Sequence, residues 1–173
     1  RLRPMMMHQS YIMFGGKDEK VIEPFMAAIE MIHTYSLVHD DLPAMDNDEY
    51  RRGRKTTHIV FGEDMGILAG DALLKYAYET AVKGVMAARD KDSAVKALEI
   101  LAKKAGITGM VGGQVVDVEL TGKKPDKDQL DFIFRLKTGA LLEASLMVGA
   151  ALAGADDKDI ELMEKAGLNI GMA

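Results

Sequence analysis

Apolar residues recur at three- and four-residue intervals along most of the chain, the spacing of an amphipathic helix, and seldom alternate as they do in strands. Helices are expected over the segments 20–41, 64–88, 92–105, 107–120, 126–153 and 156–172. The strong helix formers Ala, Leu, Met, Glu and Lys dominate these segments, whereas runs of Val, Ile and Thr are scarce. The pattern therefore predicts an all-α protein.

Glycine and proline mark the expected helix boundaries. The glycines at these boundaries are Gly15-Gly16, Gly62, Gly106 and Gly154. Pro24 is expected in the first turn of its helix, where a missing N–H is harmless, and Pro125-Asp126 is expected to start the long segment that follows it.

Two segments, Met110–Val118 and Ala140–Ala153, are apolar around most of their circumference. Helices of this kind are buried from several sides, either inside a large bundle or at a dimer interface. Long helices joined by short loops favour an antiparallel helical bundle. With 173 residues the chain is long enough for a substantial core, and no linker or repeat divides it, so we expect a single domain over 1–173.

Composition narrows the functional class. Hydrophobic residues make up 48% and charged residues 28%, as in ordinary globular proteins, and the net charge of −5 argues against a nucleic-acid partner. The absence of cysteine excludes disulfides, thiol nucleophiles and cysteine metal sites. No apolar run approaches the ~18 residues of a membrane span and no signal peptide is visible, so a soluble, cytoplasmic protein is expected. Neither end of the sequence resembles a natural terminus, so the domain is expected to be incomplete at both ends.

The most informative stretch runs from His39 to Lys55, where five acidic residues are followed at once by four basic ones. The helix that leads into it should end near Leu42, because a residue that precedes proline avoids the helical conformation. Asp40 and Asp41 are therefore expected at a helix C-terminus, where the helix dipole disfavours each negative charge by about 0.3–1 kcal/mol. A nearby cation would make this placement favourable.

Carboxylate oxygens suit Mg²⁺, which takes one or two of them together with water and phosphate oxygens. Arg51 and Arg52 lie close enough in the sequence to bind the same phosphate. His33 precedes Asp40 by seven residues, so it lies two turns away on the same helix face, roughly 10 Å along the axis. The alternatives are a solvated charged loop whose acids pair with the adjacent bases, and a histidine packed in the core.

The stretch Glu30–Asp48, followed by Arg51-Arg52-Gly53, resembles the first aspartate-rich motif of the trans-polyprenyl diphosphate synthases. The two-residue expansion between the aspartate pair and the next aspartate is similar to that of the bacterial farnesyl and the plant and bacterial geranylgeranyl types. The resemblance continues in the same order through Phe61-Gly62-Glu63, Leu68–Leu74, Gly112-Gly113-Gln114 with Asp117, and Lys137–Leu141. It implies an isoprenoid synthase fold, an antiparallel bundle around a central cavity. It also implies a Mg²⁺-dependent prenyltransferase that condenses dimethylallyl or geranyl diphosphate with isopentenyl diphosphate.

By this resemblance, the catalytic residues come from the aspartate-rich motif and from a later helix. They are Asp40, Asp41, Asp46, Arg51 and Lys137. The three aspartates would hold Mg²⁺, and Arg51 and Lys137 would contact the allylic diphosphate.

The same resemblance implies that isopentenyl diphosphate is bound by Arg3, His33 and Arg52. The family pattern Gly-Gly-Lys-Arg precedes Leu2-Arg3-Pro4; Arg1 would be its arginine, and its lysine is missing here. The alternatives are that Arg3 is a surface charge near the N-terminus and that Arg52 forms a salt bridge within its loop.

Lys137 and Thr138 resemble a lysine-threonine pair that faces the allylic diphosphate from a helix bend. The alternative is a helix kink with a solvated lysine. Gln114 and Asp117, one turn apart, would border the same cavity, or else form an interhelical hydrogen bond. The glycines expected to permit close helix packing are Gly109, Gly112 and Gly113.

In such an enzyme the allylic C–O bond ionises, and Mg²⁺ and the arginines stabilise the charge on the leaving pyrophosphate. Product length would depend on the depth of the cavity. Tyr35 lies five residues before Asp40, roughly 7.5 Å down the helix axis, and resembles the floor of farnesyl-type enzymes, whereas small Ser36 blocks less. This favours farnesyl over geranylgeranyl diphosphate. The alternative is that Tyr35 only packs in the core and another helix sets product length.

The family's second aspartate-rich motif, Phe-Gln-x-x-Asp-Asp-x-x-Asp, would begin where the sequence stops, at 171–173. Two interpretations follow: an active prenyltransferase whose remainder lies outside this sequence, or a truncated, non-catalytic helical subunit that binds a diphosphate and acts through association. A terpene cyclase is a third, which Arg3, His33 and Arg52 disfavour because they match positions for a second diphosphate. The wide apolar helices also predict a homodimer.

Overall fold

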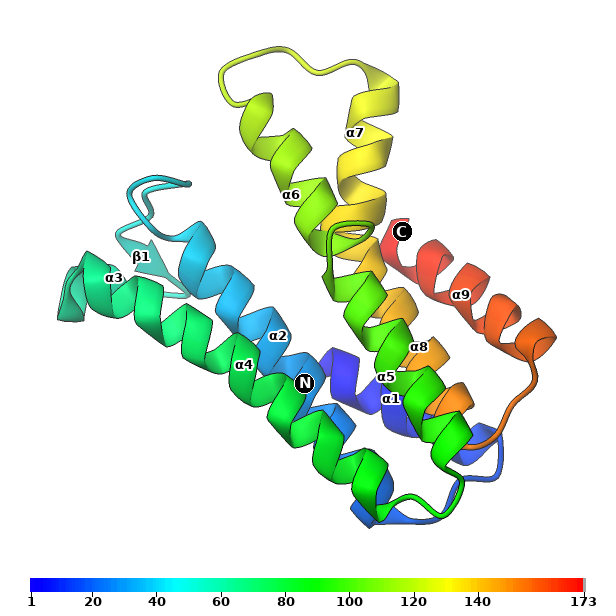
Figure 1. Cartoon of the computed structure of the whole chain (residues 1–173). Coiled ribbons are helices and arrows are strands. Elements are labelled where there is room, and N and C mark those ends of the chain that lie inside the picture. Colours follow the sequence, from blue (N-terminus) through cyan, green and yellow to red (C-terminus); the bar gives the residue numbers. More distant parts are fainter. Residues whose placement is uncertain (173) are drawn as a thin grey trace.

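The computed structural model describes residues 1–172, so Ala173, the last residue of the expected domain, lies outside it. In chain order the helices are α1 Leu2–Met13, α2 Glu19–Asp40, α3 Thr57–Phe61, α4 Glu63–Ala87, α5 Lys91–Ala105, α6 Met110–Glu119, α7 Lys127–Ile133, the π-helical turn η1 Phe134–Gly139, α8 Ala140–Leu152 and α9 Asp157–Met172 (Figure 1). A short antiparallel hairpin, β1 Tyr50–Arg51 and β2 Arg54–Lys55, lies between α2 and α3. The all-α prediction is confirmed.

Helix α8 is the central element of the bundle. Every residue of α8 except Leu146 is buried, and the helix contacts α1, α5 and α9 on different sides. Its small residues allow these close contacts, since a Cβ at Gly149 would lie 2.2 Å from the carbonyl oxygen of Met7 in α1. The prediction that this segment is buried from several sides is therefore confirmed.

Helices α2 and α4 lie side by side as an antiparallel pair at one edge of the bundle (Figure 1). Buried small residues of α4, including Ala77, Ala81 and Gly84, let the two helices approach closely. A Cβ at Gly84 would lie 2.7 Å from the carbonyl oxygen of Val21 and 2.8 Å from the ring of Phe25. This pairing fixes the C-terminal end of α2, where the aspartate-rich stretch begins.

Four features differ from the helices that the hydrophobic pattern predicts, and the first is the five-residue helix α3, which was not expected. Helix α1 is not predicted, because only Met7, Ser10 and Tyr11 are buried and so narrow a stripe gives a weak periodic signal. Pro24 lies in the second turn of α2, not the first, because the helix begins at Glu19 after an Asp18 cap. The expected helix over 126–153 is divided into α7, η1 and α8, since the π-helical turn interrupts it.

The predicted helix boundaries otherwise agree with the structure. Gly15, Gly62 and Gly154 have φ values of 90°, 98° and 83°, which favour glycine where the chain leaves a helix. The Asp126 side chain accepts a hydrogen bond from the Gln129 N–H, and the Gln129 side chain accepts one from the Asp126 N–H, so α7 begins with a capping box.

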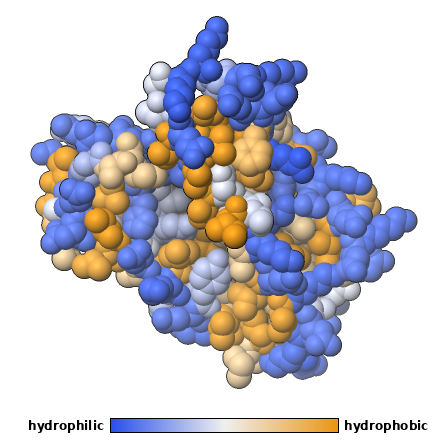
Figure 2. Space-filling view, turned by 45° about the horizontal axis from the view of Figure 1, so that its top comes forward, coloured by the Kyte–Doolittle hydropathy of each residue, from blue (hydrophilic) through white to orange (hydrophobic). Residues whose placement is uncertain are grey.

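The surface carries apolar side chains as well as charged ones. Figure 2 shows the molecule from the side on which the aspartate-rich loop lies. Apolar side chains gather in the middle of this face, and hydrophilic side chains surround them. The outward side of α4 also exposes large apolar residues, namely Met65, Ile67, Leu68, Tyr76, Val82 and Met86. Within residues 1–172, no helix combines the length and apolar character needed to cross a membrane.

Candidate active site

A cavity of about 370 Å³ opens between α1, α2, α6 and η1. It is lined by Arg3, His33, Tyr35, Ser36, Leu37, His39, Asp40, Met45, Met110, Val111, Gln114, Lys137 and Thr138. Eight of these residues were predicted as site residues from the sequence: Arg3, His33, Tyr35, Ser36, Asp40, Gln114, Lys137 and Thr138. The fold therefore brings together the predicted residues from three distant parts of the chain.

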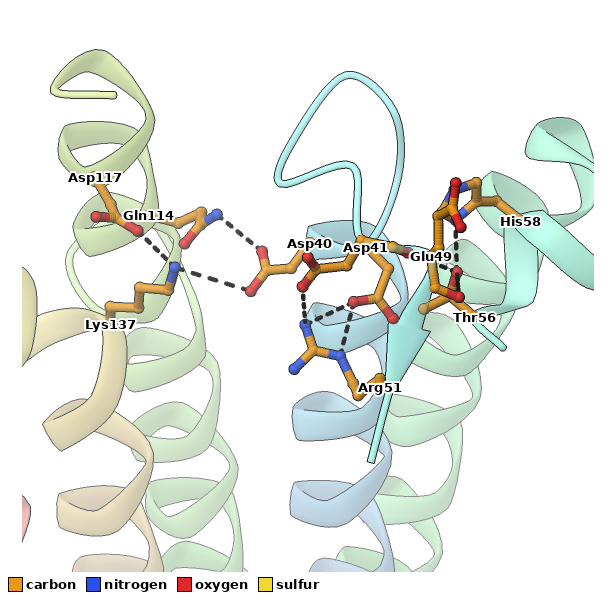
Figure 3. A network of polar contacts seen from close by, with 10 residues as sticks. Asp40, Asp41, Glu49, Arg51, Thr56, His58, Gln114, Asp117 and Lys137 are labelled. Atoms are coloured by element: carbon orange, nitrogen blue, oxygen red, sulfur yellow. Dashed lines mark hydrogen bonds and ion pairs between the residues drawn. The ribbon is translucent and has the colours of Figure 1, made fainter. Parts of the chain in front are cut away.

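Asp40, at the C-terminal end of α2, joins three helices at the cavity. Its Oδ1 accepts a hydrogen bond of 2.8 Å from Gln114 Nε2, and its Oδ2 lies 4.0 Å from Lys137 Nζ (Figure 3). Lys137 Nζ also donates to Asp117 Oδ2 at 2.6 Å. Burial raises the pKa of Asp40, and the negative charges of Asp46 and Asp41 add to this rise, while Lys137 and Arg51 oppose it.

Asp41 points away from this cluster, although it is the next residue. It caps α2, is only 4% exposed, and its Oδ1 accepts from Arg51 Nε at 2.7 Å and from Arg51 Nη2 at 2.6 Å (Figure 3). Arg51 also lies 3.7 Å from Asp48. The charged-loop alternative thus describes Asp41 and Asp48, whose partner is an adjacent base, but not Asp40, whose partners come from α6 and η1.

Two further predicted residues lie beside this cavity without lining it, whereas Arg52 is exposed in the turn of the β1–β2 hairpin. Asp46 and Asp117 line a second hollow of about 390 Å³ that shares Lys137 and Thr138 with the first. The Asp46 N–H donates to the Asp40 carbonyl at 2.9 Å, so the loop folds back over the end of α2. Within the described part of the chain, no three His, Asp or Glu side chains are already grouped as metal ligands.

The other pole of the cavity is basic. The pKa of His33 is lowered to about 4, first by burial and then by the positive charge of Arg3, with smaller contributions from Arg52 and Arg1. Burial also lowers the pKa of Arg3, and the Arg3 Nε has no hydrogen-bond partner among residues 1–172. Arg1 pairs with Glu30 at 2.6 Å, so Arg3, not Arg1, remains available to a ligand. This pole is suited to an anion.

Lys137 and Thr138 lie on the π-helical turn η1, which agrees with the predicted helix bend. Helix α6 packs directly against this turn, because a Cβ at Gly113 would lie 2.4 Å from the Lys137 backbone nitrogen. The prediction of close helix packing is confirmed for Gly113, whereas Gly109 and Gly112 lie against carbonyl oxygens of the chain just before α6. Lys137 is held between two carboxylates, so the alternative of a solvated lysine does not apply.

Gln114 and Asp117 form interhelical contacts, one of the two interpretations considered for them, but they line different hollows and not the same cavity. Each makes a polar contact with another helix, Gln114 with Asp40 and Asp117 with Lys137, and each borders one of the two hollows. Figure 3 shows both side chains pointing from α6 toward the charged cluster.

Tyr35 lies one turn below His39 on α2 and is 7% exposed. Its ring meets the His39 ring edge-on, with centroids 5.8 Å apart and planes at 87°. Burial raises its pKa, and Tyr78 and Asp40 add to the rise. Ser36 is turned toward its own helix, since its Oγ donates to the His33 carbonyl at 3.0 Å. His39 was not predicted as a site residue, although it lies next to the predicted aspartates.

The titration of His33 gives a testable prediction. Its pKa of about 4 in the folded protein lies below the usual 6.5, so the unfolded chain takes up the proton first as the pH falls. The free energy of unfolding should therefore decrease as the pH falls from 6.5 to about 4, with no contribution from this group above that window. Because His33 is only partly buried, we expect this contribution to be about 1 kcal/mol at the acidic end.

Urea unfolding of the wild type and of His33→Gln, at pH values from about 7.5 to 4.5, isolates this contribution. The variant should lose stability less steeply than the wild type below pH 6.5 and in parallel with it above that value. Parallel curves throughout would contradict the assignment.

Comparison with known proteins agrees with this geometry. The sequence matches the polyprenyl synthetase family model over residues 1–173. It is 49% identical to a geranylgeranyl diphosphate synthase of Cyanophora paradoxa, over 100% of this chain and 57% of that protein, and 44% identical to a farnesyl diphosphate synthase of Geobacillus stearothermophilus, over 100% and 58%. Among solved structures it resembles an FPP/GFPP synthase from Zymomonas mobilis, with a TM-score of 0.92 and 33% identity over 99% of this chain and 62% of that one.

The chain thus spans roughly half to three fifths of the length of these relatives. Within that span the family model matches the whole chain. The chain belongs to the polyprenyl synthetase family.

Proposed function

We propose that the protein containing this chain is a prenyltransferase that joins an allylic diphosphate, dimethylallyl or geranyl diphosphate, to isopentenyl diphosphate and yields farnesyl diphosphate and pyrophosphate. The observation that carries the proposal is a single cavity with two charged poles and an aromatic residue in its wall. One pole comprises Asp40 and Lys137 and the other comprises Arg3 and His33, while Tyr35 lies on α2 between His33 and Asp40. Two poles suit two diphosphates in one reaction.

Asp40 and Asp46 suit Mg²⁺, with Asp41 beside them. Their ligand atoms are hard carboxylate oxygens at the mouth of a cavity. Burial, together with the negative charges of Asp46 and Asp41, raises the pKa of Asp40, and a divalent cation would favour its charged form. When bound there, Mg²⁺ would act as a Lewis acid toward the leaving diphosphate.

The chain's own residues have distinct tasks in this reaction. Lys137, Thr138 and Arg51 would bind the allylic diphosphate and stabilise the charge that develops as the C–O bond breaks and its electron pair leaves with the pyrophosphate. Arg3, His33 and Arg52 would orient isopentenyl diphosphate, whose double bond then forms the new C–C bond with the allylic cation. The proton that is lost goes to the released pyrophosphate.

The cavity wall would keep water from the cation. Apolar side chains, including Leu37, Met110 and Val111, line the space between the two poles, and water there would quench the carbocation. Gln114 and Asp117 would hold Asp40 and Lys137 in place until the diphosphate arrives.

Product length, assembly and location are further parts of the proposal. Tyr35 supports a fifteen-carbon product, whereas the relatives include both farnesyl and geranylgeranyl synthases. The single domain over 1–173, the homodimer and the cytoplasmic location stay predictions, and one relative, from Catharanthus roseus, is named as chloroplastic.

The test is an assay of the full-length protein with labelled isopentenyl diphosphate and each allylic primer, with Mg²⁺ or with EDTA. Mg²⁺-dependent incorporation into a fifteen-carbon product is the expected result. A twenty-carbon product would support the prenyltransferase function but would reject the proposal that Tyr35 forms the floor of the cavity. Pyrophosphate release without isopentenyl diphosphate would indicate a cyclase, and no reaction in a folded protein would indicate a binding subunit.

A further inference from the structure

His39 links the cavity to the neighbouring helix α4. Its imidazole lines the cavity, while its Nε2 donates a hydrogen bond of 3.0 Å to the carbonyl oxygen of Ile67 in α4. The same nitrogen lies 4.0 Å from Asp71 Oδ1. The ring is therefore anchored to the backbone of α4, which packs beside α2 (Figure 1).

Gly70 makes the space that the ring occupies. A Cβ at this position would lie 2.0 Å from His39 Nε2 and 2.2 Å from Cδ2, and real Cβ atoms essentially never approach closer than 3.0 Å. Gly70 is buried inside α4, where a glycine makes a helix less stable than alanine does. Gly70 therefore lowers the stability of α4 but leaves space for the His39 ring.

His39 in turn supports Tyr35. The two rings meet edge-on, with centroids 5.8 Å apart and planes at 87°, an arrangement that aromatic pairs favour. They lie one turn apart on α2, so they share the side of the helix that faces the cavity. If the imidazole moved, the Tyr35 ring would lose this edge-on contact.

We propose that His39, seated against Gly70, is a positioning residue that fixes Tyr35 and thereby sets the depth of the cavity and the length of the product. The proposal rests on the prenyltransferase function proposed above. The direction of each change follows from the geometry. A methyl group at Gly70 pushes the imidazole away from α4 and into the cavity, which shortens the space for the growing chain. Removal of the imidazole leaves Tyr35 without its support and deepens that space.

Product distributions of full-length variants test this arrangement. His39→Ala should raise the ratio of twenty- to fifteen-carbon product about tenfold, the effect of a small change of apolar volume in a specificity pocket. Gly70→Ala should change it in the opposite sense and enrich the ten-carbon product when dimethylallyl diphosphate is the primer. The matched control is Gly66→Ala, one turn earlier on α4, where the new Cβ would meet Leu42 and His58 instead of His39. This control should keep the wild-type distribution.

A wild-type distribution in an active His39→Ala variant overturns the proposal, even if Gly70→Ala fails to fold. Proton NMR of the His39 ring separates this inference from the function on which it rests. The resonance should shift in Tyr35→Leu and in Gly70→Ala, but not in Gly66→Ala, whether or not the wild type turns over. A resonance that is unmoved by loss of the Tyr35 ring would show that the two residues are not coupled, and would also overturn the proposal.

Discussion

Replacing Lys137 by methionine is expected to lower kcat of the full-length protein in the proposed prenyl transfer about 100- to 1000-fold, the usual cost of removing one group that stabilises charge in a transition state. Lys137 Nζ is positioned by Asp117 at 2.6 Å and lies 4.0 Å from Asp40, at the pole proposed for the leaving diphosphate. Methionine keeps the length and flexibility of the side chain but carries no charge. Steady-state kinetics with geranyl and isopentenyl diphosphate measure the effect.

The matched control for this variant is Lys127→Met, which makes the same substitution on the preceding helix α7 at an exposed position. It should leave kcat within about twofold of the wild type, as expected for a surface site. Lys137→Arg should recover part of the activity because it restores the positive charge. A Lys137→Met enzyme with wild-type kcat would remove Lys137 from the proposed mechanism.

Replacing Lys104 by methionine is expected to destabilise the protein by about 3–5 kcal/mol, because a buried carboxylate loses its partner. Lys104 of α5 donates hydrogen bonds to Glu143 of α8 and, at 2.6 Å, to Glu164 of α9. The Glu143 side chain is only 3% exposed. Burial lowers the pKa of Lys104, but the hydrogen bonds to the two glutamates outweigh this effect and raise it above the usual value.

The adjacent residue provides the control for Lys104. Lys103 pairs with Glu99 at 2.6 Å, but both side chains are largely exposed, so Lys103→Met should cost less than about 0.5 kcal/mol. Urea unfolding of the two variants side by side measures the difference. Equal and small losses of stability would mean that Glu143 is solvated or protonated once its partner is gone.

Site residues whose geometry is local were predicted from helix geometry, whereas distant ones such as Gln114 and Lys137 were predicted only from the family resemblance. Pro43 predicts the end of α2 near Leu42, and Asp40 does end that helix. Helix geometry also explains why Asp40 and Asp41 diverge: successive residues of an α-helix point about 100° apart, so only one of them can face α6 and η1. Asp41 pairs with Arg51, and the metal cluster expected from the three aspartates stays a prediction.

The parts that were not predicted depend on how distant helices meet. The π-helical turn inserts an extra residue into a segment whose apolar spacing still fits one continuous helix. The seat of His39 against Gly70 depends on the approach of α4 to α2, which the sequence of neither helix specifies alone. Tertiary packing decides such contacts, and a periodic pattern reports only which side of a helix is apolar.

The central claim is that one cavity binds two diphosphates, and a crystal structure tests it most directly. The full-length protein would be crystallised with Mg²⁺, isopentenyl diphosphate and an unreactive thio analogue of geranyl diphosphate. The account predicts one diphosphate beside Lys137 and Asp40, the other beside Arg3 and His33, and the allylic hydrocarbon pointing toward Tyr35. A saturated complex in which no diphosphate lies beside Arg3 and His33, or in which the hydrocarbon lies outside this cavity, would contradict it.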